Sequence, residues 1–317
     1  MEIVQDNSNR SKDIDSNFGD LDGNNDGDND VACPKKKAKK DRSARGLSAQ
    51  RQDLLDIAYK HFKLLLCTEG AWSNTDDMDM LVIESWGTAC EEKDLTYTPT
   101  MKDRDLIRDR APQVRGLMKT IARGLVPQQY GFKNGHSNKV KEHNRALVMQ
   151  LKHKTAHGHI DPTSRTTLCR NPIIAEILTK MWFVDAEDDG IRYQEYFIGG
   201  PSLPLMAQVL TAVECAIDEY TTGTHVKLEM RARKYKSVYL EHLTMLNKWE
   251  AYSKTRSQAS CRMQGDLLQT LRLESSFSHV AVHLIHSRRS NAGVLEDAAL
   301  VQVLDQLTDD NFAAMEV

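Results

Sequence analysis

The stretch PSLPLMAQVLTAVECAIDEYTTG, residues 201–223, has the pattern of a long helix that packs against a core. Its apolar residues recur at spacings of three and four, which brings them to one face of a helix. They are Met206, Val209, Leu210, Val213, Ala216, Ile217 and Tyr220. Pro201 and Pro204 mark the beginning, where a helix tolerates proline, and Gly223 marks the end, where glycine is a frequent stop.

The same spacing recurs on both sides of this stretch. It predicts further helices at about 48–66, 75–89, 102–125, 138–154, 171–182 and 235–249. We expect Ser48, Thr75 and Asn171 to cap three of them, and Pro112 to kink or split the one at 102–125. Strand patterns are scarce, and the run 280–285 is ambiguous. The sequence therefore predicts an all-α fold, a single multi-helix globular domain.

Composition divides the chain into three segments. Residues 1–46 hold seven Asp between positions 13 and 30 with almost nothing apolar, so this tail cannot bury enough surface to offset its chain entropy and should be disordered. Residues 47–256 carry the helical pattern and form the predicted domain. Residues 257–317 are a more polar C-terminal extension, which either adds one or two helices, for example near 295–307, or hangs loosely.

A dense basic tract follows Pro34 in the N-terminal tail. Its lysines are Lys35, Lys36, Lys37, Lys39 and Lys40. Such a tract in an exposed tail is typical of a nuclear import signal that an import receptor binds in extended form, so we expect nuclear localisation. The alternatives are a solvated run of charges or an arm that touches nucleic acid.

Other features agree with an intracellular protein. The beginning of the chain lacks the basic and apolar regions of a secretory signal, and no window approaches the roughly 18 apolar residues of a membrane-spanning helix. The six cysteines lie too far apart in sequence for a disulfide framework or a paired-cysteine zinc site. We therefore expect a reducing compartment and no membrane contact.

Several segments of the helical region resemble an uncharacterised fungal (basidiomycete) family, the domain of unknown function 6532. The most specific matches are Asn171-Pro172-Ile173-Ile174, Met181-Trp182-Phe183, Glu195-Tyr196-Phe197, Ala212-Val213-Glu214-Cys215, Asp218-Glu219-Tyr220 with Gly223, and Tyr239-Leu240-Glu241-His242-Leu243. The resemblance covers roughly 47–252, and Tyr220 stands where the family pattern has Trp. It implies a helical domain and a mushroom-forming fungus as the source, and it transfers no activity, cofactor or catalytic residue.

Charge is segregated along the predicted domain. Residues 100–154 hold 13 basic and 4 acidic side chains, whereas residues 171–220 hold 2 basic and 9 acidic ones. On two predicted helices the cations form stripes, one of Arg104, Arg108, Arg115 and Lys119 and the other of Lys141, Arg145 and Lys152. These stripes predict contact with phosphate groups or with an acidic partner. The alternative is that they face carboxylates of other helices, within the chain or between subunits.

Two groups of histidines have spacings that allow a metal site. His279, His283 and His286 would share one face of a helix, and His153, His157 and His159 lie in a predicted loop. A row of surface or half-buried histidines is the more common structure, so we expect no cofactor. The carboxylates Glu214, Asp218 and Glu219 are predicted to be solvated, and Cys215 to be a small core residue.

These patterns favour a non-enzymatic nuclear protein whose helical domain binds another macromolecule, nucleic acid or an acidic protein. No phosphate-binding loop, nucleophile elbow or dinucleotide fingerprint is present. Two alternatives stay open: a metal-dependent enzyme that uses either histidine group, and a self-associating module in which oppositely charged segments pair between subunits.

Overall fold

The structure is a computed structural model that describes residues 44, 46–165, 167–185, 187–256, 260–273 and 275. The described residues belong to one compact unit. The import-like lysines at 35–40, the histidines at 279–286 and the ambiguous run 280–285 lie outside the described residues, as does the helix proposed near 295–307.

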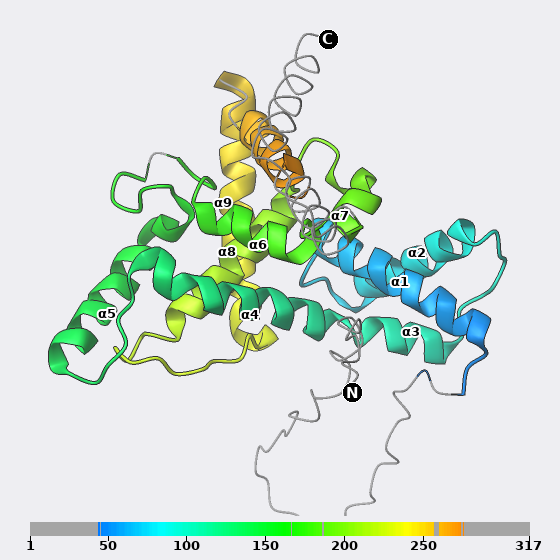
Figure 1. Cartoon of the computed structure of the whole chain (residues 1–317). Coiled ribbons are helices and arrows are strands. Elements are labelled where there is room, and N and C mark those ends of the chain that lie inside the picture. Colours follow the sequence, from blue (N-terminus) through cyan, green and yellow to red (C-terminus); the bar gives the residue numbers. More distant parts are fainter. Residues whose placement is uncertain are drawn as a thin grey trace, which may run out of the picture. The chain divides into compact units, whose positions relative to one another are not determined.

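The prediction of an all-α fold is confirmed (Figure 1). The helices are α1 (Ala49–Thr68), α2 (Thr75–Glu92), α3 (Met101–Arg108), α4 (Ala111–Tyr130), α5 (Asn138–Lys152), α6 (Pro172–Trp182), α7 (Asp189–Arg192), α8 (Leu203–Asp218) and α9 (Ala232–Arg256). Two 3-10 helices, η1 (His153–Gly158) and η2 (Gln194–Phe197), join them, and residues 260–273 are also helical. The described residues contain no strand, only one isolated bridge between His159 and Leu168. None of their helices is long and apolar enough to cross a membrane.

Helix α8 is the centre of the packing. It contacts α1, α4, α5, α6 and α9, and all of its residues except Pro204 and Glu214 are buried. A helix that is buried on every side needs apolar residues around most of its circumference. The single apolar face expected from the spacing was therefore too narrow, because Leu203, Leu205 and Ala212 are buried as well.

Most helix ends follow the sequence signals. The hydroxyl of Ser48 accepts a hydrogen bond from the Arg51 backbone at 3.4 Å, and Asn171 caps α6, as predicted. Pro112 lies in the first turn of α4 and separates it from α3, which confirms the split. The cap of α2 is Asn74 and not Thr75, because the Asn74 side chain accepts from the Asp77 backbone.

Gly223 serves a different purpose from the predicted helix stop. Helix α8 ends at Asp218, and Gly223 has a φ of +92° in the following turn. A Cβ atom at this position would lie 2.7 Å from the backbone oxygen of Lys141. Glycine is therefore needed here for the close approach of this turn to α5 as well as for its left-handed backbone.

The core extends beyond residue 256. Met263, Leu268 and Leu271 are buried with the rest of the core, and the Gln264 side chain donates to the Pro201 carbonyl at 2.9 Å. The described part of the C-terminal extension therefore packs against the domain.

A buried carboxylate links α1 to the beginning of α3. Asp103 is fully buried, completes a capping box with Thr100, and accepts hydrogen bonds from Arg51 Nε at 3.1 and 3.2 Å. Burial alone would raise the pKa of Asp103, but the hydrogen bonds from Arg51 and Thr100 bring that pKa below its usual value. A carboxyl with a lowered pKa in the folded state stabilises the fold above its unfolded pKa and loses this effect on acidification.

We predict that Asp103→Asn lowers the free energy of unfolding by about 2–3 kcal/mol at pH 7, because it leaves Arg51 without its partner. The difference from wild type should shrink as the pH falls below about 3.8, the usual pKa of Asp, because Asp103 of the unfolded chain is protonated there before the folded protein takes up the same proton. Urea denaturation between pH 7 and pH 3 measures it, with the exposed Asp53→Asn as control. A difference that stays constant over this range would contradict the assignment.

Candidate functional site at the C-terminal end of helix α8

Three carboxylates at the end of α8 are largely withdrawn from solvent. The side chains of Glu214, Asp218 and Glu219 are 13%, 4% and 0% exposed. The expectation of solvated carboxylates is therefore wrong. The flanking core residues indicated one apolar face, but α4, α5 and α9 cover the other sides of the helix as well.

Glu219 is surrounded by donors. It forms an ion pair with Lys119, accepts from Arg123 Nε at 2.9 and 3.0 Å, and lies 2.9 Å from His225 Nε2. The backbone N–H of Leu228 donates to it as well, at 3.0 Å. These contacts hold α4 and the segment after α8 against the end of α8.

Lys119 departs most clearly from its predicted place on an outward-facing basic stripe. It is 3% exposed, and its ammonium group also donates to the Leu228 carbonyl at 2.6 Å. Its four-carbon stem lies among buried residues, while its charge meets Glu219. Lys119 is therefore not available to a phosphate group or to an acidic partner.

Asp218 and Glu214 contact residues of α5 and α9. Asp218 accepts from Lys152 Nζ and Lys234 Nζ, both at 2.6 Å, and from the Tyr235 hydroxyl at 3.0 Å. Glu214 pairs with Lys152 at 3.2 Å. Burial alone would lower the pKa of Lys152, but the two carboxylates raise it above its usual value, so Lys152 is fully charged at neutral pH.

The other residues of the predicted stripes do not gather into one free cationic surface. Arg108 pairs with Asp79 and Asp105, and the Arg115 guanidinium lies 4.5 Å from the Trp72 ring centre. Arg104 and Lys141 are half-buried, and Arg145 donates to the Thr222 carbonyl at 3.1 Å. For Lys119, Lys152 and Arg108, the structure shows pairing within the chain, one of the two alternatives that the charge pattern left open.

Of the predicted histidine group at 153–159, only His157 lies next to one of the three carboxylates. His157 is completely buried next to Glu214 and to His242 of α9, whereas His153 is exposed. Burial and the neighbouring His242 lower the pKa of His157 to about 4, despite the opposing effects of Glu214 and of backbone carbonyls, so the ring is neutral at pH 7. His242 lies far away in sequence, within the helix predicted at 235–249. No spacing could have linked the three residues.

The backbone before His157 is unusual. Lys154 and Thr155 both have left-handed conformations, with φ of 52° and 56°, which residues with side chains adopt only at some cost. A Cβ on Gly158 would lie 2.9 Å from a methyl group of Leu210. The small residue and the tight turn together let η1 approach α8 and place His157 in the interior.

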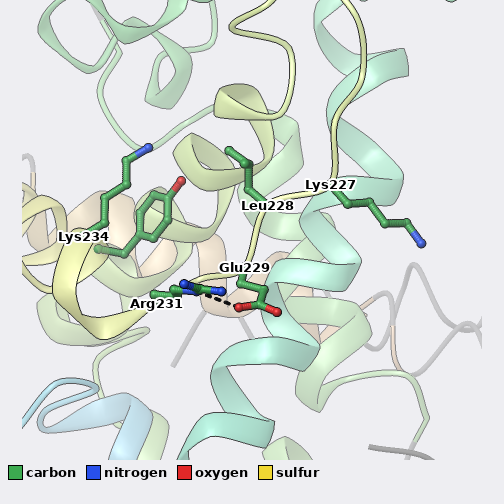
Figure 2. A pocket seen from close by; sticks show the side chains of 6 residues that line it. Lys227, Leu228, Glu229, Arg231 and Lys234 are labelled. Atoms are coloured by element: carbon green, nitrogen blue, oxygen red, sulfur yellow. Dashed lines mark hydrogen bonds and ion pairs between the residues drawn. The ribbon is translucent and has the colours of Figure 1, made fainter. Parts of the chain in front are cut away.

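A shallow pocket lies beside the carboxylates, at the surface. It has a volume of about 360 Å³ and is lined by Lys227, Leu228, Glu229, Arg231, Lys234 and Tyr235. Figure 2 shows Arg231 and Glu229 pointing toward one another, at 2.7 Å, while Lys227 extends away from them. Three cations and one carboxylate give the pocket a positive lining.

We predict that Glu219→Gln lowers the free energy of unfolding by about 3–5 kcal/mol, because it leaves the buried Lys119 without a counter-charge. The matched control is Glu229→Gln, which breaks a pair whose side chains are 53% and 76% exposed and should cost less than about 1 kcal/mol. Chemical denaturation at pH 7 measures both. Equal effects of the two substitutions would contradict the structural role of Glu219 and its ion pair with Lys119.

Comparison with known proteins identifies the domain but not an activity. No curated protein and no solved structure matches the chain. The model of one family, a domain of unknown function (DUF6532), matches residues 57–249. This range contains Glu214, Asp218 and Glu219 together with His157 and His242. Because the match spans more than half of the chain, the chain belongs to the DUF6532 family.

Proposed function

We propose that this chain is a non-enzymatic nuclear protein whose helical domain binds nucleic acid through the exposed cations of residues 225–236, the basic segment. The observation that carries the proposal is the contrast between two sets of cations. Those on α4 and α5 are largely engaged inside the chain. The basic segment has five exposed cations: Arg231 pairs with Glu229 and Lys234 with Asp218, whereas Lys227, Arg233 and Lys236 form no ion pair among the described residues.

The basic segment is held in place against the domain. His225 and the backbone of Leu228 contact Glu219, and Lys234 contacts Asp218. Helix α9 begins at Ala232, within the segment, so its positive end adds to the positive potential there. A cationic surface that is already ordered loses little conformational freedom when it binds an anion.

The chemistry of the segment favours contacts with phosphate over contacts with bases. Tyr235 is its one aromatic residue of the Phe, Tyr and Trp type, and it is 1% exposed, so no stacking platform is available. Glu229 is its one acidic residue. Duplex DNA, recognised through its backbone without sequence preference, fits such a surface best.

We also infer that the N-terminal tail delivers the protein to the nucleus. The support is the sequence alone: Lys35, Lys36, Lys37, Lys39 and Lys40 in a setting of low apolar content. The fungal source belongs to the same proposal, and it rests on the resemblance. Self-association through oppositely charged segments would have to use other cations than Lys119 and Lys152, which pair within the chain.

We predict that full-length protein binds labelled duplex DNA with an affinity that falls steeply with salt. Reversing three charges, in Lys227→Glu, Arg233→Glu and Lys236→Glu together, should weaken binding at least about tenfold and reduce the slope of log affinity against log salt by about 2–3. The matched control reverses Lys93, Lys248 and Arg262, which are also exposed but lie outside the segment. Both variants keep the N-terminal lysines, so their difference reports the basic segment.

Two outcomes would overturn this function. One is the absence of DNA binding by the wild type at about 50 mM salt, where phosphate contacts are strong. The other is an equal loss in the control variant, which would assign the binding to net charge. In the first case an acidic protein partner becomes the better candidate for the same surface.

We predict that deletion of residues 34–42 disperses a fluorescently tagged protein into the cytoplasm, because it removes the lysines that an import receptor would bind. Deletion of the nine acidic-segment residues 22–30 is the control of equal length and should leave nuclear enrichment unchanged. Fluorescence microscopy compares the two. Nuclear enrichment that survives loss of 34–42 would remove the import signal from the proposal.

A further inference from the structure

Three side chains able to bind a metal converge beside α8 from distant parts of the sequence. They are His157 of η1, Glu214 of α8 and His242 of α9, and one donor atom of each lies within 4.8 Å of the other two. Two imidazoles and a carboxylate, with water in the fourth position, form a donor set that holds Zn²⁺ in proteins. We propose that these three residues bind a divalent transition-metal ion, preferably zinc, which fastens η1, α8 and α9 to one another.

His157 has the geometry of a metal ligand. Its Nδ1 lies 3.1 Å from the Leu151 carbonyl oxygen, which can only accept, so Nδ1 carries the proton and Nε2 presents a lone pair. Nε2 is buried and has no partner at hydrogen-bond geometry among the described residues, although the Leu210 backbone, like that of Leu151, acts on the ring and raises its pKa. Histidines that bind metals ordinarily donate their other ring N–H to a carbonyl or carboxylate, as His157 does.

Glu214 and His242 supply the remaining donors. Glu214 Oε2 lies 3.0 Å from His242 Nε2, and Glu214 Oε1 lies 3.2 Å from Lys152 Nζ. A metal ion between Glu214 Oε2 and His242 Nε2 would replace the hydrogen bond that joins them, and the proton would leave Nε2 for Nδ1 of the same ring or for solvent. Lys152 would keep its contact with Oε1. Lys152 then orients the carboxylate in the way that outer partners of metal ligands do.

A second buried histidine shows what a purely structural pairing looks like in this fold. His61 is 2% exposed and also contacts a glutamate, since its Nε2 lies 3.3 Å from Glu92. Its Nδ1, however, lies 2.9 Å from the Tyr196 hydroxyl, so both ring nitrogens have partners. His157 differs because its Nε2 has no partner at hydrogen-bond geometry among the described residues, and because the ring lies beside a carboxylate and a second imidazole.

The three side chains need only a small movement to close around an ion. Ligand atoms about 2.0–2.1 Å from a tetrahedral zinc ion lie roughly 3.4 Å from one another. The present separations reach 4.8 Å. Rotations of the Glu214 and His242 side chains can supply the difference, since neither belongs to the strained turn that precedes His157.

The test uses the full chain without a histidine tag, stripped with a chelator and dialysed against buffered Zn²⁺. We expect wild type to bind zinc, and His157→Gln and His242→Gln each to lose one equivalent or to bind it at least about 100-fold more weakly, since even outer partners are worth 10–100-fold. The matched control His61→Gln should bind as wild type does. The site would be overturned if wild type binds no zinc or if both variants bind it unchanged. It would also be overturned if zinc is lost only in His283→Ala, which removes a histidine of the other group.

A second measurement applies if the variants do not fold. X-ray absorption at the zinc edge of the wild-type protein should show two imidazole nitrogens and oxygen ligands. A sulfur ligand, or a shell of three imidazoles, would overturn the assignment. The site does not rest on nucleic-acid binding, and reversal of Lys227, Arg233 and Lys236 should leave the bound zinc unchanged.

Discussion

The burial of three carboxylates at one end of α8 is the constraint on which the rest of the domain depends. A carboxylate withdrawn from water is costly unless charges and hydrogen bonds compensate it. Here the compensation comes from elements far apart in sequence: Lys119 of α4, Lys152 of α5 and Lys234 of α9. Apolar packing alone would tolerate many arrangements of amphipathic helices, whereas these pairs favour one.

The geometry of a helix determines which neighbouring helix each carboxylate contacts. Glu214 and Asp218 are four residues apart and share one face, so they meet α5 and α9 together. Glu219 lies about 100° further around the axis and meets α4 instead. One helix end thus connects three neighbours, and the same arrangement brings His157 and His242 to Glu214.

This constraint also separates the cations into two populations. Those of α4 and α5 that looked like a binding stripe are largely engaged in the architecture, since a buried or half-buried cation with an internal partner has no free charge to offer. The basic segment is anchored by the same carboxylates, but three of its five exposed cations, Lys227, Arg233 and Lys236, form no ion pair among the described residues, so their positive charge faces solvent. Charge counted along the sequence could not make this distinction, because it depends on what packs above each side chain.

The amino-acid sequence by itself determined the helical class and most of the helix ends. Periodicity, the caps Ser48 and Asn171 and the break at Pro112 are local signals, because each depends only on residues within a few positions along the chain. Asn74 shows the limit of such signals, since two adjacent cap-forming residues compete and one hydrogen bond selects between them. Tertiary structure alone decided that α8 is buried on all sides, that Lys119 lies inside, and that His157 meets His242. These features arise from contacts between segments tens of residues apart, and whether a side chain is buried, paired or free depends on those contacts and not on its neighbours in the chain.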